Sequence, residues 1–228
     1  MPASFEIEAL KAQAIAVRSY TYKKLETKSH NDVNLCTDPN HCQAWKSPEE
    51  TENYRKIVKA VEETEGKVAT YDGKIINAVY HASSGGFTEN AINVWSGQED
   101  YLISVKSPKE EIRLSEVVVS TKDFLNKLKL KDSKKIEIKI LSRTEGNRVK
   151  EISINKKIFT GNEIRKIFNL KSSNFEVFIK NADIKFEVKG YGHGVGLSQW
   201  GAQAMALEGK TCEEIIKHYY TGVEIQIV

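Results

Sequence analysis

The chain has 228 residues, enough for one large domain or two small ones, with 34 basic and 31 acidic residues. A formal net charge of +3 and the lack of a basic helix or RNA-binding signature exclude nucleic acid as an expected partner. No run of 18 apolar residues predicts a membrane span, and the first ten residues lack the basic segment of a signal peptide. A helical pattern begins within the first ten residues. We therefore expect that this sequence is a fragment of a longer chain, or that the true start of the protein lies upstream of Met1.

Residues 5–26 are predicted to form a buried helix, because Leu10, Ala14 and Val17 recur at helical spacing and alanine is frequent. Arg18 lies on the same general face, where a charged side chain needs a partner or a ligand. A polar, loop-like stretch covers residues 28–45. A second helix is then predicted to begin after the N-cap residue Ser47.

Asp72-Gly73 separates two strand-like runs, residues 67–71 and 74–80, and this dipeptide is the strongest short signal for a β-hairpin. The hairpin is expected to deliver the segment 81–86 at its far end. Trp95 follows in a loop.

Residues 107–181 differ from the rest in being rich in Lys, Ile and Glu, without histidine or cysteine. Alternating strands and two short helices are predicted in this block, which we expect to be an inserted α+β subdomain. Residues 1–106 and 182–228 then form the groove core of a single domain. The predicted fold class is α+β, with antiparallel hairpins and the alanine-rich first helix around a groove.

Residues 190–201 contain five glycines, between which stand Tyr191, His193, Ser198, Gln199 and Trp200. A strand pattern precedes this glycine loop and a helical pattern follows it, an arrangement that displays polar groups at the edge of a cleft. A dinucleotide loop is the first alternative, but the spacing of the third glycine is wrong for it. A tight turn with a hydrogen-bonded structural histidine is the second.

His81, Ser83 and Ser84 combine with His193 in a pattern that invites a hydrolase triad. No Gly-x-Ser-x-Gly elbow and no obvious orienting acid accompany them, which disfavours a nucleophilic serine. Short hydroxyls and imidazoles together with Trp95, Tyr191 and Trp200 better suit sugar recognition, since pyranose rings offer apolar faces and hydroxyl edges.

His30, Cys36, His41 and Cys42 match a tetrahedral Zn²⁺ site in ligand type. Four protein ligands leave no open position, so a zinc ion here is expected to be structural, and a zinc-dependent hydrolase is disfavoured. A Cys36–Cys42 disulfide is the alternative, and Cys212 is expected to be a lone buried thiol.

Glu6 and Glu8 stand at the start of the first helix. A glutamate beside an alanine-rich apolar helix can have a raised pKa and act as a general acid. Acidic residues are also favoured in a first helical turn by the helix dipole alone.

Three segments together resemble the signatures of the stage II sporulation protein D family, which includes amidase-enhancer proteins. They span the chain from one end to the other: residues 1–20, 81–86 and 191–202. The His/Cys cluster is similar to that of clostridial-type members, in which it binds zinc.

The resemblance implies a lytic transglycosylase that cleaves peptidoglycan between N-acetylmuramic acid and N-acetylglucosamine, on strands already stripped of stem peptides by an amidase. One carboxylic acid protonates the glycosidic oxygen and the muramic 6-hydroxyl closes on the anomeric carbon, so no second carboxylate is needed. Glu8 is the nearby acid at a family-like position, and Arg18 is expected to support the acid or the substrate. Tyr20 joins the substrate-binding residues predicted above, which are His81, Ser83, Ser84, Trp95, Tyr191, His193, Ser198 and Gln199.

One departure concerns the acid, because family members commonly carry a glutamate directly before the Met-Pro-Ala segment, and this chain begins at Met1. The resemblance also implies that the protein acts outside the cytoplasm during spore engulfment. Full-length members carry a membrane anchor, and sporulation membrane proteins are the implied partners. A non-catalytic glycan-binding or amidase-activating module is the alternative to the enzyme.

Overall fold

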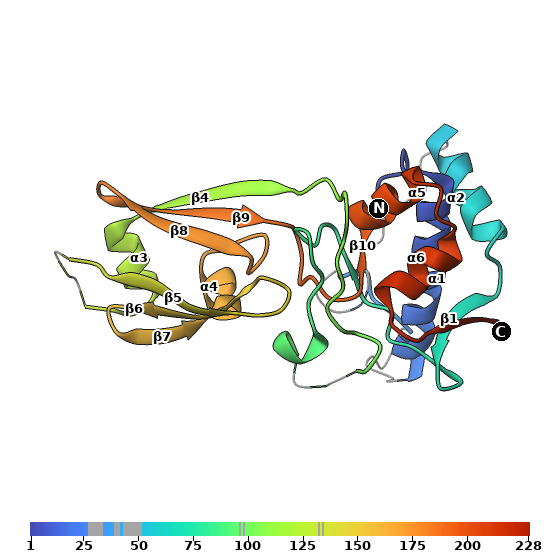
Figure 1. Cartoon of the computed structure of the whole chain (residues 1–228), viewed down its shortest axis with the longest axis horizontal. Helices are drawn as coiled ribbons and strands as arrows, with labels where there is room; N and C mark the ends of the chain where they lie inside the picture. The colour runs from blue at the N-terminus through green and yellow to red at the C-terminus, as the bar shows by residue number, and fades with distance from the viewer. Residues whose placement is uncertain are drawn as a thin grey trace.

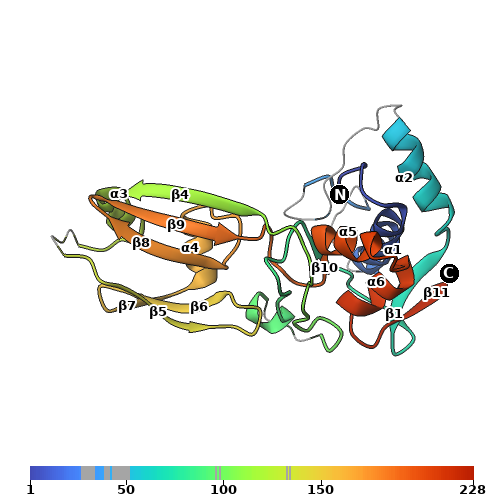
Figure 2. The same cartoon turned by 45° about the horizontal axis from the view of Figure 1, so that its top comes forward.

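The computed structural model describes residues 1–26, 34–38, 42, 52–95, 97, 99–131, 133 and 135–228. These residues form two lobes that lie end to end along the long axis of the molecule (Figure 1, Figure 2). The helical lobe holds both ends of the chain, and the sheet lobe is built from its middle. The α+β prediction is therefore confirmed. No helix among these described residues has the length and apolar content needed to cross a bilayer.

The helical lobe consists of α1 (Ile7–Glu26), α2 (Glu52–Glu62), β1 (Lys67–Tyr71), β2 (Lys74–Ile75), β3 (Tyr80–His81), the 3₁₀-helix η1 (Ala91–Asn93), β10 (Leu197–Ser198), α5 (Gln199–Leu207), α6 (Cys212–Tyr219) and β11 (Glu224–Ile227). The sheet lobe consists of β4 (Leu114–Ser120), α3 (Thr121–Lys127), β5 (Ile138–Arg143), β6 (Val149–Ile154), β7 (Lys157–Thr160), α4 (Gly161–Ile167), β8 (Phe175–Lys180) and β9 (Asp183–Lys189).

Helix α1 is the centre of the helical lobe, and α2, α5, α6 and β1 pack around it (Figure 1). Its most buried face repeats small residues at intervals of three and four, namely Ala9, Ala12, Ala16 and Ser19. The predicted stripe was only partly right, since Leu10 is buried but Ala14 and Val17 are partly exposed. Small side chains on the buried face let the neighbouring elements approach the helix closely.

The hairpin at Asp72-Gly73 is confirmed, and both residues have the positive φ angles (48° and 72°) that its tight turn requires. The predicted second arm was too long. Strand β2 ends at Ile75, because the chain bends where the Ala78 N–H donates to the Ile76 carbonyl at 3.0 Å. Strand β3 then pairs in parallel with β10, which joins the segment 81–86 to the end of the glycine loop.

The sheet lobe contains two antiparallel sheets, with strand orders β4-β9-β8 and β5-β6-β7. With α3 and α4 they enclose a core in which four phenylalanine rings meet: Phe124, Phe168, Phe175 and Phe186. The sequence analysis assigned residues 182–228 to the groove core, whereas β9 pairs with β4 and β8 and belongs to the sheet lobe. The reason is its alternation, which buries Ile184, Phe186 and Val188 completely in the sheet-lobe core.

Candidate functional site

The glycine loop and the segment 81–86 lie against each other at the point where the two lobes meet. Ser83 and Tyr191 exchange two backbone hydrogen bonds of 3.1 and 2.8 Å, next to the β3–β10 pair. Gly192 has a φ of +117°, and a Cβ there would stand 2.7 Å from the Cβ of His81. Only glycine permits this approach, so the two sequence motifs form one site.

Two imidazoles hold the backbone of one residue, Val195, between them at the centre of this site. The Val195 N–H donates to Nδ1 of His193 at 3.1 Å, and the Val195 carbonyl lies 3.1 Å from Nδ1 of His81. Nε2 of His193 lies 3.0 Å from the Tyr80 carbonyl, so His193 carries its proton on Nε2 and His81 carries its proton on Nδ1. Nε2 of His81 is buried and has no hydrogen-bond partner within the described residues.

Both histidines are neutral at physiological pH. Burial and the nearby Arg165 lower the pKa of His193 to about 4, against the weaker effect of the Tyr80 carbonyl. Burial and the neighbouring His193 lower the pKa of His81 well below its usual range. The pair therefore offers hydrogen-bonding and ring surfaces rather than positive charge.

Aromatic rings extend the site to the surface. The Trp95 ring lies 5.0 Å from the His193 ring, and its side chain remains 42% exposed. Tyr191 is 48% exposed, with the Lys171 ammonium 4.8 Å from its ring centre. On another side, the Tyr20 ring meets Tyr80 edge-on at 6.5 Å. The structure thus brings Trp95 and Tyr191 to the surface of the histidine site, and Tyr20 beside it.

The three serines of the predicted site point inward, to a carboxylate that the sequence analysis did not find. The hydroxyls of Ser83 and Ser84 each donate a hydrogen bond of 2.5 Å to the Glu110 carboxylate, and the Ser198 hydroxyl donates one of 3.0 Å. The Ser84 N–H adds a fourth donor at 2.7 Å. All three serines are fully buried and Glu110 is nearly so. Glu110 therefore joins the two motifs from beneath, and the serine hydroxyls are not presented at the surface.

A buried arginine from the sheet lobe supports the same two segments. Arg148 stands just after the turn between β5 and β6 and donates to the carbonyls of Ser84 and Phe87 at 2.9 and 3.1 Å. A Cβ on Gly194 would lie 2.0 Å from its guanidinium, and Gly194 has a φ of +86°. Burial lowers the pKa of Arg148 to about 10, so it stays charged, with Glu89 and Glu110 as counter-charges.

Glu89, a second buried carboxylate, ties the lobes together nearby. It accepts hydrogen bonds from the Thr144 hydroxyl of the sheet lobe and from the Asn93 amide of η1. Asn162 of α4 donates to the Asn93 carbonyl at 3.0 Å. No periodic pattern or motif marks Glu89, Glu110 or Arg148 in the sequence, and no local signal in the sequence could have found them.

Comparison with known proteins gives the same result as the three motifs. Residues 1–71 match the family model described as stage II sporulation protein. The chain is 37% identical over 241 residues to stage II sporulation protein D of Bacillus amyloliquefaciens and 38% identical over 242 residues to that of Bacillus subtilis. Each alignment covers 99% of this chain and 70% of the relative. The chain belongs to the stage II sporulation protein D family.

A third relative is the amidase enhancer of Bacillus subtilis, which is 32% identical over 283 residues. That alignment covers 99% of this chain but 39% of the relative. Both lobes therefore have counterparts in all three relatives.

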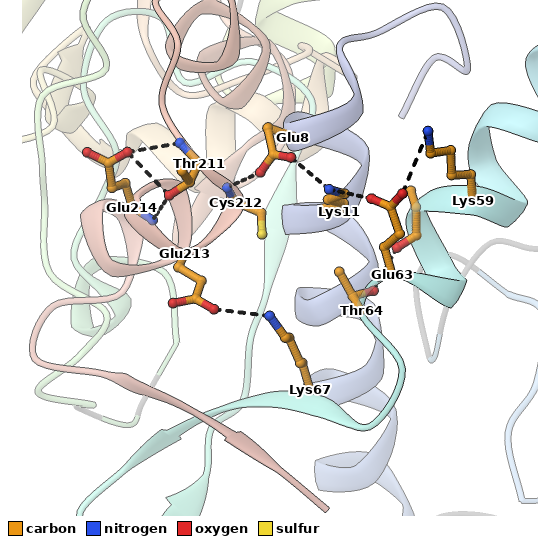
Figure 3. Close-up of polar contacts among 11 residues, drawn as sticks. Glu8, Lys11, Lys59, Glu63, Thr64, Lys67, Thr211, Cys212, Glu213 and Glu214 are labelled. Atoms are coloured by element: carbon orange, nitrogen blue, oxygen red, sulfur yellow. Dashed lines mark hydrogen bonds and ion pairs between the residues drawn. The ribbon is translucent and has the colours of Figure 1, made fainter.

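Glu8, the predicted catalytic acid, lies in a set of ion pairs at the start of α1 (Figure 3). Its carboxylate accepts the Cys212 N–H at 2.7 Å and pairs with Lys11 at 2.9 Å, and Lys11 also contacts Glu63. Burial raises the pKa of Glu8, but the bonds from Lys11 and Cys212 outweigh it and hold the pKa below its usual range. Such a carboxylate is a poor proton donor, and its contacts instead fasten α1 to α2 and α6.

Arg18 and Gln199 also have partners within the protein. The Arg18 guanidinium donates to the carbonyls of Thr64 and Lys67 at 2.6 and 2.8 Å, just beyond the end of α2. It is ten residues from Glu8 on the same helix, about 15 Å along the axis, so the two predicted catalytic residues are not brought together. Gln199 donates to the Gln13 side chain at 3.1 Å.

Two of the four predicted zinc ligands, His30 and His41, lie outside the described residues. Cys42 is buried and Cys36 half-buried, and both raise the pKa of Tyr20, next to burial as the main cause. The two thiols therefore both lie near Tyr20. Cys212 is buried, as predicted, and burial together with the Glu8 carboxylate raises its pKa to about 11.

Proposed function

We propose that this chain binds the glycan strands of peptidoglycan and is the body of a lytic transglycosylase that cleaves them. The observation that carries the proposal is the pair of half-exposed rings near the neutral His193: Trp95, whose ring lies 5.0 Å from the imidazole, and Tyr191, two residues earlier in the glycine loop. Aromatic faces and uncharged hydrogen-bonding groups suit pyranose rings, whose faces are apolar and whose edges carry hydroxyls. The family membership supports the bacterial cell wall as the place where the protein acts.

The reaction needs one general acid and no water. The acid protonates the glycosidic oxygen while the 6-hydroxyl of the muramic acid unit attacks the anomeric carbon. The glycosidic bond breaks, a 1,6-anhydro ring forms, and the hydroxyl proton returns to the carboxylate. A single carboxyl group completes the cycle, in contrast to the paired carboxylates of glycoside hydrolases.

We place this acid at the position directly before Met1, as the family resemblance implies, rather than at Glu8. The first residues lie beside the end of the glycine loop, because the Phe5 ring meets Trp200 edge-on at 4.8 Å. Glu8, Glu89 and Glu110 each accept hydrogen bonds from groups inside the protein, so their oxygens are engaged there rather than presented to a substrate.

Mass spectrometry of denuded glycan strands tests the proposal. The chain is incubated as it stands and in a second form with Glu added before Met1. We expect 1,6-anhydro-muramic ends only from the extended form. Anhydro products from both forms would return the acid to an internal residue, and no anhydro product from either would contradict the transglycosylase.

A structural Zn²⁺ is part of the proposal, with Cys36 and Cys42 as two ligands and His30 and His41 as the others. The two thiols near Tyr20 fit the soft donor set that zinc prefers. When bound, the ion would crosslink the segment that follows α1. It would take no part in the reaction. We expect a chelator to lower the melting temperature of the wild type. It should leave the melting temperature of the double variant Cys36→Ser, Cys42→Ser unchanged.

The relative named amidase enhancer supports a second candidate function, an accessory module that binds glycan and activates an amidase. Binding of denuded strands without cleavage by either form, together with faster amidase turnover, would favour it. In both cases we propose that the protein works outside the cytoplasm, during sporulation, held at the membrane by parts of the full-length protein.

A further inference from the structure

Strand β4 is an edge strand of the sheet β4-β9-β8, and it borders the sheet lobe in both views (Figure 1, Figure 2). With seven residues it is the longest edge strand in the part of the chain that the structure describes. It contains no proline and no lysine, and its register with β9 runs without a bulge from Leu114 to Ser120. Soluble proteins usually protect such an edge with a bulge, a lysine or proline, or a covering segment.

The other edges of the sheet lobe carry protection of this kind. Strand β5 has a register shift between Ile140 and Arg143, and β7 has only four residues. The Arg143 guanidinium donates to the Phe175 carbonyl at 3.1 Å and so covers the start of β8. The unprotected edge of β4 is therefore an exception within its own lobe.

The hydrogen bonds at the two ends of β4 show which of its residues bond to β9. The Gly190 N–H donates to the Arg113 carbonyl at 2.8 Å, and the Thr121 N–H donates to the Ala182 carbonyl at 2.9 Å. Both pairs continue the register of the strand. Because bonded and non-bonded pairs alternate in an antiparallel ladder, the odd-numbered residues of β4 are the ones that bond to β9.

The even-numbered residues Leu114, Glu116 and Val118 therefore direct their N–H and carbonyl groups away from β9. No other described residue pairs with these backbone groups. The side chains of Leu114 and Val118 are exposed as well. The edge thus offers a row of unpaired donors and acceptors beside apolar side chains, which is a template for one more strand.

The charges on the exposed face indicate what that strand must carry. Glu116 lies opposite Glu187 of β9, which in turn lies opposite Glu176 of β8. Lys185 offsets part of this charge through ion pairs of 2.7 and 2.9 Å with Glu116 and Glu187. Like charges directly opposite each other are unfavourable. A strand that pairs with Glu116 is therefore favoured when it places a neutral residue there and a positive charge close by.

A second copy of β4 meets this requirement in one register. When two copies pair antiparallel about Val117, Glu116 of each lies opposite Val118 of the other, and all seven residues are paired. Lys185 of the second copy stands one strand beyond its Val118, which continues the glutamate row with a positive charge. If the pairing were instead centred on Glu116, the two Glu116 side chains would face each other directly.

We propose that β4 pairs with β4 of a second copy in the register centred on Val117, which joins two three-stranded sheets into one. The helical lobe lies at the start of β4 (Figure 1), so antiparallel pairing places the two candidate sites at opposite ends of the dimer. One pair of strands buries less area than a standard interface, and we expect a Kd of about 10–100 μM. The inference does not depend on the proposed function.

Sedimentation velocity of the chain from about 1 μM to about 1 mM tests the dimer. Two variants test the register. Val118→Glu places a carboxylate opposite Glu116 of the other copy, twice by symmetry, whereas Val118→Lys places an ammonium there. We expect the Kd of Val118→Glu to exceed that of Val118→Lys about 10-fold. Ile158→Glu and Ile158→Lys are the matched controls on the edge strand β7, with 58% exposure against 60% for Val118, and their Kd values should agree.

A third variant removes an edge donor and spares the sheet. The Val118 N–H points away from β9, so Val118→Pro keeps the ladder with β9 while it removes two hydrogen bonds of the dimer. We expect this variant to stay monomeric, with thermal unfolding as the check on its fold. A wild type that stays monomeric throughout would overturn the proposal and leave the edge to a strand of another protein. A dimer that persists in Val118→Pro, or has equal Kd values in Val118→Glu and Val118→Lys, forms on another surface and would overturn it too.

Discussion

The sheet-lobe core and the candidate functional site have opposite kinds of interior. The sheet-lobe core is a cluster of phenylalanine rings, built on strands whose alternation is visible in the sequence. The glycine loop and the segment 81–86 are instead supported by Glu110, Glu89 and Arg148, which are nearly fully buried charged groups. Apolar burial stabilises a lobe without fixing individual loops, whereas directional bonds fix backbone positions at the cost of desolvation. The site region therefore gives up stability for defined geometry.

The first prediction removes the acceptor at the centre of that network. Glu110→Ala leaves three buried hydroxyls and one N–H without their partner, each worth about 1–3 kcal/mol. We expect a loss of about 3–5 kcal/mol in the free energy of unfolding, measured by urea denaturation. Glu111→Ala, an exposed neighbour, is the control and should change it by less than about 0.5 kcal/mol. A loss below about 1 kcal/mol for Glu110→Ala would mean that the serines find other acceptors.

The second prediction separates the lobes. Arg148→Met keeps most of the side-chain volume but removes the bonds to the Ser84 and Phe87 carbonyls. We expect a loss of about 2–4 kcal/mol, with calorimetry showing two transitions where the wild type shows one. Arg55→Met on the exposed face of α2 serves as the control. A single transition in Arg148→Met at the wild-type temperature would contradict the coupling role.

These charged groups also mark the limit of what the sequence predicts. The turn at Asp72-Gly73, strand β1 and helix α1 follow from local patterns and were predicted at or near their observed bounds. Glu110 stands in an irregular segment with no periodicity, and its donors are 26, 27 and 88 residues away. No local rule connects residues at such separations.

The candidate site shows the same limit. The sequence correctly grouped the motifs that contain His81 and His193, because glycines and imidazoles mark a displayed loop. It could not tell that Ser83, Ser84 and Ser198 turn inward while Trp95 and Tyr191 remain exposed, since the parallel pairing of β3 with β10 sets those directions. Glu8 fits a family-like position in sequence, but its role depends on α6, which packs against it from the far end of the chain.

The third prediction concerns the loss of stability at acidic pH, which is the smallest of the three expected effects on stability. Unfolded histidine titrates near pH 6.5, whereas folding lowers the pKa of His193 to about 4 and lowers the pKa of His81 well below its usual range. The unfolded chain therefore binds more protons between pH 6.5 and 4, and stability falls as the pH drops through this window. Glu8, whose pKa is lowered on folding, contributes a further loss only below about pH 4.5.

We expect the melting temperature to fall by several degrees from pH 7 to pH 4.5, by differential scanning fluorimetry. His193→Gln should flatten this dependence, while Glu8→Gln should keep it and reduce only the loss at lower pH. If the melting temperature of His193→Gln falls with pH as steeply as that of the wild type, groups other than His193 control the pH dependence.

The most direct measurement is the binding of six-sugar denuded glycan to Trp95→Ala by titration calorimetry, beside wild type and Phe178→Ala. Phe178 is an aromatic residue of β8 with similar exposure, 46%, in the sheet lobe. If the surface at His193 holds a sugar ring, Trp95→Ala raises the Kd about 5–30-fold, or about 1–2 kcal/mol, and Phe178→Ala leaves it unchanged. Equal Kd values for wild type and Trp95→Ala would contradict a glycan site at this surface.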